Sequence, residues 1–188
     1  PTLVGFISGT QVVGYYVLAD RVRLLAYSTI TPISQALFPR LNSLFSSNKE
    51  EARSLYVRSA YFLLPISALI STSIFFASEW MVLLLAGNEF ANSATLLKIL
   101  APAPFLVCAS NLLGMQLLIP NGFGRLFNRV VTSVAVGSAL SAFLLIYSFG
   151  AKGGAVSVVV TELVIAVAMS VAVWKFRTSI FNGAKNAV

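Results

Sequence analysis

The sequence contains no histidine and a single cysteine, Cys108, and only 10% of its 188 residues are charged. The imidazole that most often ligates zinc and activates nucleophiles is therefore missing. One cysteine within an apolar segment forms no disulfide framework, so the sequence does not indicate a redox compartment. There is also no closely spaced acidic pair, no glycine-rich phosphate loop before a helix, and no nucleophile with a base in the same motif. The sequence therefore predicts no enzyme, no metal site and no cofactor site.

Hydrophobic residues take the place of the missing charges. They make up 57% of the chain, and the mean hydropathy is +0.86. In soluble domains, by contrast, about a quarter of the residues are charged. Because apolar stretches recur along the whole chain, the sequence predicts a polytopic membrane protein. Its expected fold class is all-α, a single transmembrane helical bundle without a separate water-soluble domain.

Five complete transmembrane helices and one partial helix are predicted, because a spanning helix needs about 20 mostly apolar residues. Residues 1–7 are too few and are interpreted as the end of a helix, and Pro1, which is not an initiator methionine, favours a fragment of a longer protein. The polar stretch 46–59 is predicted to be a surface helix in a cytoplasmic loop. The complete spans are expected at residues 14–44, 60–78 with an extension to 86, 96–119, 128–149 and 154–174.

The chain is basic, with 13 Lys and Arg against 6 Asp and Glu and a net charge of +7. The Lys and Arg residues mostly lie between apolar segments and form no Lys/Arg-rich run, which argues against nucleic acid as a partner. Nine fall on one predicted membrane face and two, Lys98 and Lys152, on the other, while Arg21 and Arg23 lie inside. The positive-inside rule puts the nine-charge face, and with it the C-terminus, in the cytoplasm. The nine are Arg40, Lys49, Arg53, Arg58, Arg125, Arg129, Lys175, Arg177 and Lys185.

A polar stripe marks the predicted helix over residues 14–44. At about 100° per residue its polar side chains fall on one narrow face, with mostly apolar residues such as Val22 and Leu25 opposite. A charge in hydrocarbon is costly, so the stripe is expected to face protein or a water-filled cavity rather than lipid. The stripe comprises Tyr16, Asp20, Arg23, Tyr27, Thr31 and Ser34.

Charges inside the membrane are the strongest candidates for functional residues. Arg23 and Glu162 lie about nine and eight residues in from the same predicted membrane face, so their depths match to about one helical turn. A pair between Glu162 and Arg23 or Arg21 is compatible with these depths. Structural interpretations remain open beside it. In these interpretations Asp20 and Arg23, three residues apart, only neutralise each other. Arg21 would reach to the lipid headgroups, and Glu162 would be an internal packing partner.

The uncharged polar residues inside the spans allow two interpretations. Tyr27 and Gln35 either line a path or satisfy the backbone groups that Pro32 frees in its helix. Gln116 is predicted to form hydrogen bonds between helices. A ridge of small residues for close helix packing is predicted at Ser133, Gly137 and Ser141.

Four segments follow one another in a characteristic order: VGYYVLADRV (13–22), PISQALFPRLNSL (32–44), LLLAGNEFANSATLLKILAP (83–102) and GMQLLIPNG (114–122). Together they resemble the second half of polysaccharide-biosynthesis flippases, the O-antigen (Wzx-type) transporters of the MOP superfamily. The resemblance covers about residues 13–122, and the last two predicted helices match mainly in hydropathy. It implies one lobe of a two-lobe transporter, here the C-terminal one, whose N-terminal lobe is a partner outside this sequence.

The resemblance also implies a function in the bacterial inner membrane. Such flippases move undecaprenyl-pyrophosphate-linked oligosaccharides from the cytoplasmic to the periplasmic leaflet by alternating access. Arg23, and less directly Arg21, would then bind the pyrophosphate. Tyr27 and Gln35 would contact sugar, and Asp20 or Glu162 would tune the arginines or accept a coupling proton or cation.

Two alternative functions remain open. A cavity rich in aromatic side chains and without a cationic face would favour an ion-coupled exporter of small drugs from the same superfamily. A non-transporting membrane scaffold in a glycan-assembly complex would have its polar stripe sealed by neighbouring helices, with no cavity beside it.

Overall fold

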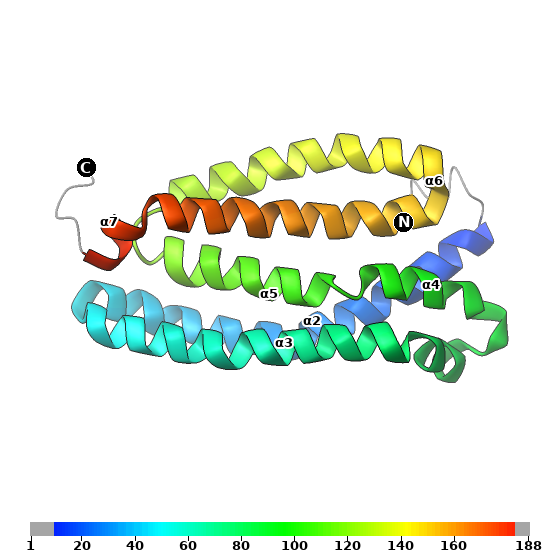
Figure 1. The fold of residues 1–188 in the computed structure, drawn as a ribbon, viewed down its shortest axis with the longest axis horizontal. Helices are drawn as coiled ribbons and strands as arrows, with labels where there is room; N and C mark the ends of the chain where they lie inside the picture. Colours follow the sequence, from blue (N-terminus) through cyan, green and yellow to red (C-terminus); the bar gives the residue numbers. More distant parts are fainter. Residues whose placement is uncertain (1–9, 183–188) are drawn as a thin grey trace.

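The computed structural model describes residues 10–182, and within this range every regular element is helical. Its long helices run side by side along one axis (Figure 1). We call the two ends of the bundle the α7 end and the Gly150 end. The predicted partial helix over residues 1–7 lies outside the described residues. The elements are α2 (Thr10–Ser47), α3 (Lys49–Ala86), η1 (Asn88–Phe90), α4 (Ala91–Leu100), α5 (Ala103–Leu113), η2 (Gly114–Leu118), α6 (Gly124–Lys175) and α7 (Arg177–Asn182).

Helix α2 contains the whole predicted range 14–44 and continues through two prolines, Pro32 and Pro39. A proline inside a helix removes one backbone hydrogen bond. In the turn before Pro32, the Thr31 hydroxyl donates to the Tyr27 carbonyl at 2.8 Å and the Thr29 hydroxyl to the Ala26 carbonyl at 2.8 Å. These bonds allow hydroxyl groups to lie in a membrane without unpaired donors.

Helix α3 joins two segments that were predicted to be separate, the surface helix over 46–59 and the span that follows it. Asn48 caps its start by accepting from the Glu51 N–H at 3.3 Å, and the helix ends before Gly87, whose φ is 76°. No helix-breaking residue stands between Lys49 and Tyr61, so the helix continues. At about 1.5 Å per residue it exceeds the hydrocarbon core of about 30 Å, and its polar first turns extend beyond it.

The segment predicted as one span over 96–119 is divided into three pieces. Helix α4 ends at Leu100, a turn follows at Ala101 and Pro102, and α5 and then the π-helical segment η2 complete it. The break frees N–H groups at the start of α5. That of Phe105 donates to the buried Ser71 hydroxyl of α3 at 3.1 Å, so α3 supplies the cap that α5 lacks locally.

Helix α6 doubles back on itself, so that its two arms lie side by side (Figure 1). The reversal takes place at Gly150, the one residue inside α6 with non-helical backbone angles, φ 58° and ψ −135°. A positive φ of this kind favours glycine, since it has no Cβ. The spans predicted at 128–149 and 154–174 fall in the two arms, but the loop expected between them is reduced to this single reversal.

The described residues support a polytopic helical membrane protein without establishing the predicted count of five complete spans and a partial one. Three stretches are long and apolar enough to cross a membrane: Lys49–Ala86, Asn88–Leu118 and Gly124–Lys175, the last of which is the doubled α6. Helix α2 is absent from this set, and its first half carries Asp20, Arg21 and Arg23. The charges that mark the candidate site thus also weaken the hydropathy signal of the helix that carries them.

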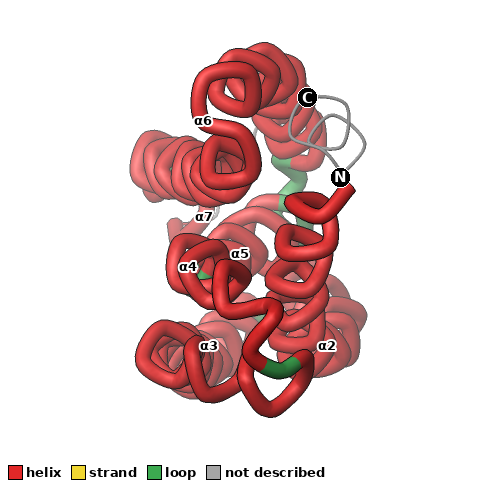
Figure 2. The backbone as a smooth tube through the Cα atoms, turned by 90° about the vertical axis from the view of Figure 1, so that its right-hand side faces the viewer, coloured by secondary structure: helices red, strands yellow, loops and turns green. Residues whose placement is uncertain are grey.

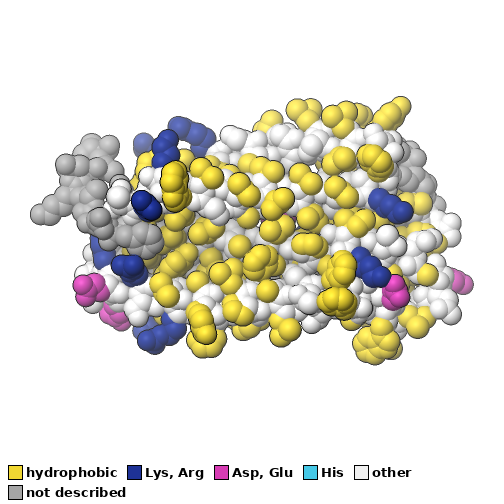
Figure 3. All heavy atoms as spheres, viewed as in Figure 1, with side chains coloured by type: hydrophobic (Ala, Val, Ile, Leu, Met, Phe, Trp, Pro, Cys, Tyr) yellow, Lys and Arg dark blue, Asp and Glu magenta, His cyan; other side chains and the backbone are white. Residues whose placement is uncertain are grey.

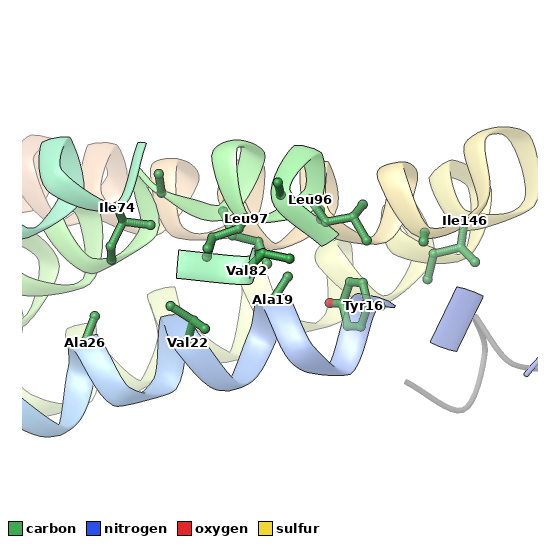
Figure 4. Close-up of a cluster of buried hydrophobic side chains, with 14 residues drawn as sticks. Tyr16, Ala19, Val22, Ala26, Ile74, Val82, Leu96, Leu97 and Ile146 are labelled. Atoms are coloured by element: carbon green, nitrogen blue, oxygen red, sulfur yellow. The ribbon is translucent and has the colours of Figure 1, made fainter. Parts of the chain in front are cut away.

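The core at the Gly150 end fixes the rotation of α2. Its Tyr16, Ala19, Val22 and Ala26 point toward side chains of α3, α4 and α6 (Figure 4). These four are buried, so the core-facing row of α2 runs beside the charged positions rather than opposite them. Figure 2 shows α2 beside the α4–α5 segment, with the arms of α6 beyond it.

The outer surface carries many large apolar side chains, as expected of a protein in lipid. They include Tyr61, Phe76 and Trp80 of α3 and Leu140 and Tyr147 of α6. In Figure 3 hydrophobic side chains spread over the face shown, while Lys and Arg gather mostly at the α7 end.

The predicted ridge of small residues does not pack within the described structure. Gly137 and Ser133 are exposed, and no heavy atom lies within 4 Å of a Cβ built on Gly137. Close packing of a glycine occurs instead in the other arm of α6. There the backbone of Gly153 lies against the Leu145 carbonyl.

Candidate functional site

The charged group at the centre of the polar stripe is formed by Asp20, Arg23 and Tyr27. Arg23 Nε donates to Asp20 Oδ1 at 2.8 Å, and Arg23 Nη2 lies 2.6 Å from the same oxygen. Arg23 Nη1 donates to the Tyr27 hydroxyl at 3.0 Å, and the guanidinium carbon lies 5.0 Å from the centre of the Tyr27 ring. A helix brings residues three and four apart together on one face, so the spacing alone assembles this group.

The group is only partly covered by the protein. The side chain of Arg23 is 12% exposed and that of Asp20 is 21% exposed. Charge-assisted hydrogen bonds are strong where water is scarce, so Asp20 holds the guanidinium in one orientation. Guanidinium has five N–H donors, and the bonds to Asp20 and Tyr27 leave some of them available for a further acceptor.

Arg23 lines an open cavity of about 360 Å³, a groove rather than an enclosed chamber, between α2 and the two arms of α6. Glu162 lines the same cavity from the second arm of α6. Arg23 and Glu162 therefore line one cavity, an arrangement that their matched depths allow. No ion pair joins the two within residues 10–182. The remaining lining residues are Ser138, Ala139, Ala142, Ser157, Val158 and Thr161.

The charges around this cavity do not cancel. Asp20 and Glu162 together carry two negative charges when both are ionised, against the one positive charge of Arg23. Because Asp20 already holds Arg23, Glu162 is the group whose charge is left over. The site can thus offer guanidinium N–H groups to an anionic oxygen and a carboxylate to a proton or cation. In residues 10–182 no three His, Cys, Asp or Glu side chains cluster as they would to hold a metal ion.

The other predicted site residues lie apart from the cavity lining. Arg21 and Gln35 are exposed on the surface of α2, where Arg21 is free to extend along it. Thr31 is exposed as well, with its hydroxyl bonded to its own helix. Tyr16, at the start of the stripe, is buried in the apolar core at 6% exposure. Only the middle of the predicted stripe therefore forms the site.

Sequence reasoning missed the hydroxyl residues that α6 contributes. Ser157 and Thr161 lie one turn apart, and the Thr161 hydroxyl donates to the Ser157 carbonyl at 2.7 Å. Together with Ser138 of the other arm they place hydroxyl groups in a wall that is otherwise largely apolar. The signal that could have revealed them is the four-residue spacing of Ser157 and Thr161, which puts both on one face of a helix, next to the charged Glu162.

The prediction for Gln116 was wrong. Its side chain is 1% exposed, yet neither Oε1 nor Nε2 has a hydrogen-bond partner among the described residues. It therefore does not link two helices in this structure.

The fold and the charged cavity define a polytopic helical membrane protein with an open, charge-bearing cavity between its helices. The chain belongs to the family described as polysaccharide biosynthesis protein, whose family model matches residues 1–95. It is 31% identical over 172 residues to a Shigella dysenteriae protein named "Putative O-antigen transporter", covering 91% of this chain and 42% of that protein. It is 28% identical over 163 residues to a protein of the same name from Escherichia coli K12, covering 87% of this chain and 39% of that protein.

The chain thus spans about two fifths of the length of these curated relatives. No solved structure matches it significantly. The similarity confirms the resemblance to O-antigen transporters, and it covers the arms of α6 as well as the part that the family model matches.

Proposed function

We propose that the protein to which this chain belongs flips a lipid-linked oligosaccharide from the cytoplasmic to the periplasmic leaflet of a bacterial inner membrane. The carrier would be undecaprenyl pyrophosphate, and the chain would form one lobe of a transporter that alternates access against an N-terminal lobe. The observation that carries this proposal is an open cavity, lined by Arg23 and Glu162, between apolar helices. The names of the curated relatives support it independently.

The residues of the cavity take the following roles in this proposal. Arg23, held by Asp20 and Tyr27, donates hydrogen bonds to the pyrophosphate, and the hydroxyl residues of α6 contact sugar. Gln35 and Arg21, exposed outside the cavity, meet the substrate only on its way in or out. Glu162 accepts a coupling proton or cation, because its negative charge has no ion-pair partner at the site.

The orientation follows from the basic residues. The α7 end, where Lys and Arg gather, would lie in the cytoplasm together with the C-terminus. Five helical rods would then cross the bilayer: α2, α3, the α4–η2 segment and the two arms of α6.

The two alternatives fit the cavity less well. A scaffold that seals its polar stripe would have no cavity beside Arg23, and a drug exporter would favour aromatic walls. Serine, threonine, alanine and valine side chains line this cavity together with the two charged residues, and no aromatic ring is among the described lining residues.

Expression of the full-length protein in a strain that lacks its own O-antigen transporter tests this function, with O-antigen on the cell surface as the readout. Wild type is expected to restore display. Tyr27→Phe removes the hydroxyl that accepts from Arg23 but keeps the ring, so display should fall severalfold, as expected for one hydrogen bond worth about 1 kcal/mol.

The matched control is Tyr15→Phe on the same helix, which removes only an exposed hydrogen bond to Gln11 and should leave display unchanged. Failure of the wild type to restore display, at normal abundance in the membrane, would contradict the proposed function.

A further inference from the structure

Gln116 is a buried polar side chain whose polar atoms are unsatisfied. It is 1% exposed, and both its amide nitrogen and its amide oxygen lack partners among residues 10–182. Its neighbours in sequence, Leu117 and Leu118, belong to the apolar cluster at the α7 end. A buried amide without hydrogen bonds destabilises the state that contains it, and an apolar side chain of similar size would suit this environment better.

The backbone around Gln116 is irregular as well. The Ile119 N–H donates to the Gly114 carbonyl five residues back, at 3.1 Å, so that η2 is a π-helical turn. The Phe123 N–H repeats this five-residue spacing to Leu118 at 3.0 Å, and Pro120 between them has no N–H to donate. A π turn contains more residues than an α turn, and such bulges occur frequently at functional sites.

The position of η2 links it to both arms of α6. A Cβ on Gly114 would lie 2.6 Å from a ring carbon of Phe127 and 3.4 Å from the sulfur of Met169. Phe127 belongs to the first arm and Met169 to the second, which also carries Glu162. A change in the winding of η2 therefore moves surfaces that pack directly against the helix of the candidate site.

Shifting a π bulge along a helix turns the residues that it passes by about 100°. Such a turn would carry the Gln116 side chain off its present apolar surroundings and change how Gly114 meets α6. If the amide groups, which lack partners here, met polar groups in that second arrangement, they would become hydrogen-bonded. The side chain would then destabilise one state and stabilise the other, as a group that biases a two-state equilibrium must.

We propose that η2 is a conformational switch in which Gln116 is the positioning residue. The present arrangement, with its amide unsatisfied, is one state of the transport cycle. In the other state the π turn has moved and the amide of Gln116 is hydrogen-bonded. This inference rests on the proposed transport function, because it assigns the second state to the transport cycle.

Gln116→Leu in the full-length protein tests the switch, because leucine removes the polar atoms while keeping most of the volume. The melting temperature of the purified protein is expected to rise by about 2 °C or more. O-antigen display is expected to fall at least about tenfold. The variant shifts the equilibrium toward the present state, so about tenfold less protein occupies the other state that the transport cycle needs. A residue with only a structural role would not raise stability and lower transport together.

Ser93→Ala is the matched control. The Ser93 hydroxyl is also buried without a partner in the described structure, but it lies in the regular helix α4. This variant should be as stable as wild type or more so, with normal display.

Three results would overturn the switch: a Gln116→Leu protein that melts at a lower temperature than wild type, unchanged display in that variant, or an equal loss of display in Ser93→Ala. Loss of display in the wild type itself would instead contradict the proposed function. The two failures are therefore distinguishable.

Discussion

Replacement of Gly153 by alanine is expected to prevent α6 from folding back on itself, so that little folded protein accumulates. A Cβ at this position would overlap the carbonyl oxygen and carbon of Leu145 in the opposite arm, and a backbone group cannot move aside as a flexible side chain can. Overpacking a well-packed site costs about 1–3 kcal/mol, and a clash with backbone should exceed this range. The readout is the yield and melting temperature of the full-length protein purified from membranes.

Gly137→Ala provides the comparison within the same element. Among residues 10–182, no atom beyond its own turn of helix lies within 4 Å of a Cβ at Gly137, and removing a glycine from a helix interior favours the helix by up to about 1 kcal/mol. Its yield should equal or exceed that of wild type. Equal yields for Gly153→Ala and wild type would show that the arms of α6 are not packed as closely as described.

Replacement of Arg23 by leucine is expected to destabilise the protein by about 3 kcal/mol and to abolish O-antigen display. Breaking a buried ion pair from one side leaves the other charge without a partner, which costs about 3–5 kcal/mol. The lower end of this range applies, because the Asp20 side chain is still 21% exposed and water solvates part of its charge. Denaturant unfolding measures the first effect and surface O-antigen the second.

The double variant Asp20→Asn with Arg23→Gln separates stability from transport. It removes both charges while leaving amides that hydrogen-bond at the same three-residue spacing, so most of the stability should return. Display should nevertheless stay absent, since no guanidinium faces the cavity. Restored display would mean that Asp20 and Arg23 only neutralise each other, which is the structural interpretation.

The matched depths of Arg23 and Glu162 could be predicted from sequence because they depend on simple quantities. The rise per residue fixes how deep a side chain lies in its helix, and the distribution of basic residues indicates which helix ends share a membrane face. Two charges at equal depth are then expected near each other when their helices are neighbours. That α2 neighbours both arms of α6 is a property of the packed bundle, which depth alone does not determine.

The features that the sequence did not reveal depend on tertiary contacts. Gly137, Ser133 and Ser141 resemble a packing ridge, but Gly153, inside a stretch predicted as a loop, is the glycine that meets another backbone. The break before α5 is stabilised by Ser71 from a distant helix. The π turn at Gln116 leaves no local pattern, because one extra residue in a turn shifts the phase of the helix without changing its composition.

The central claim is that the cavity beside Arg23 and Glu162 is a water-filled part of the transport path. Thr161→Cys and Leu163→Cys test it most directly. Each is made in a full-length protein in which every native cysteine, Cys108 among them, has been replaced. The two positions lie at nearly the same depth on opposite sides of one helix, Thr161 in the cavity and Leu163 exposed on the outer surface at 48%.

A charged, membrane-impermeant thiol reagent is expected to modify the cysteine at position 161 at least about tenfold faster than the one at 163, because a thiol reacts as the thiolate, which forms in water and not in hydrocarbon. Added lipid-linked oligosaccharide should slow the reaction at 161. Equal rates at the two positions, or no modification at 161, would contradict the account.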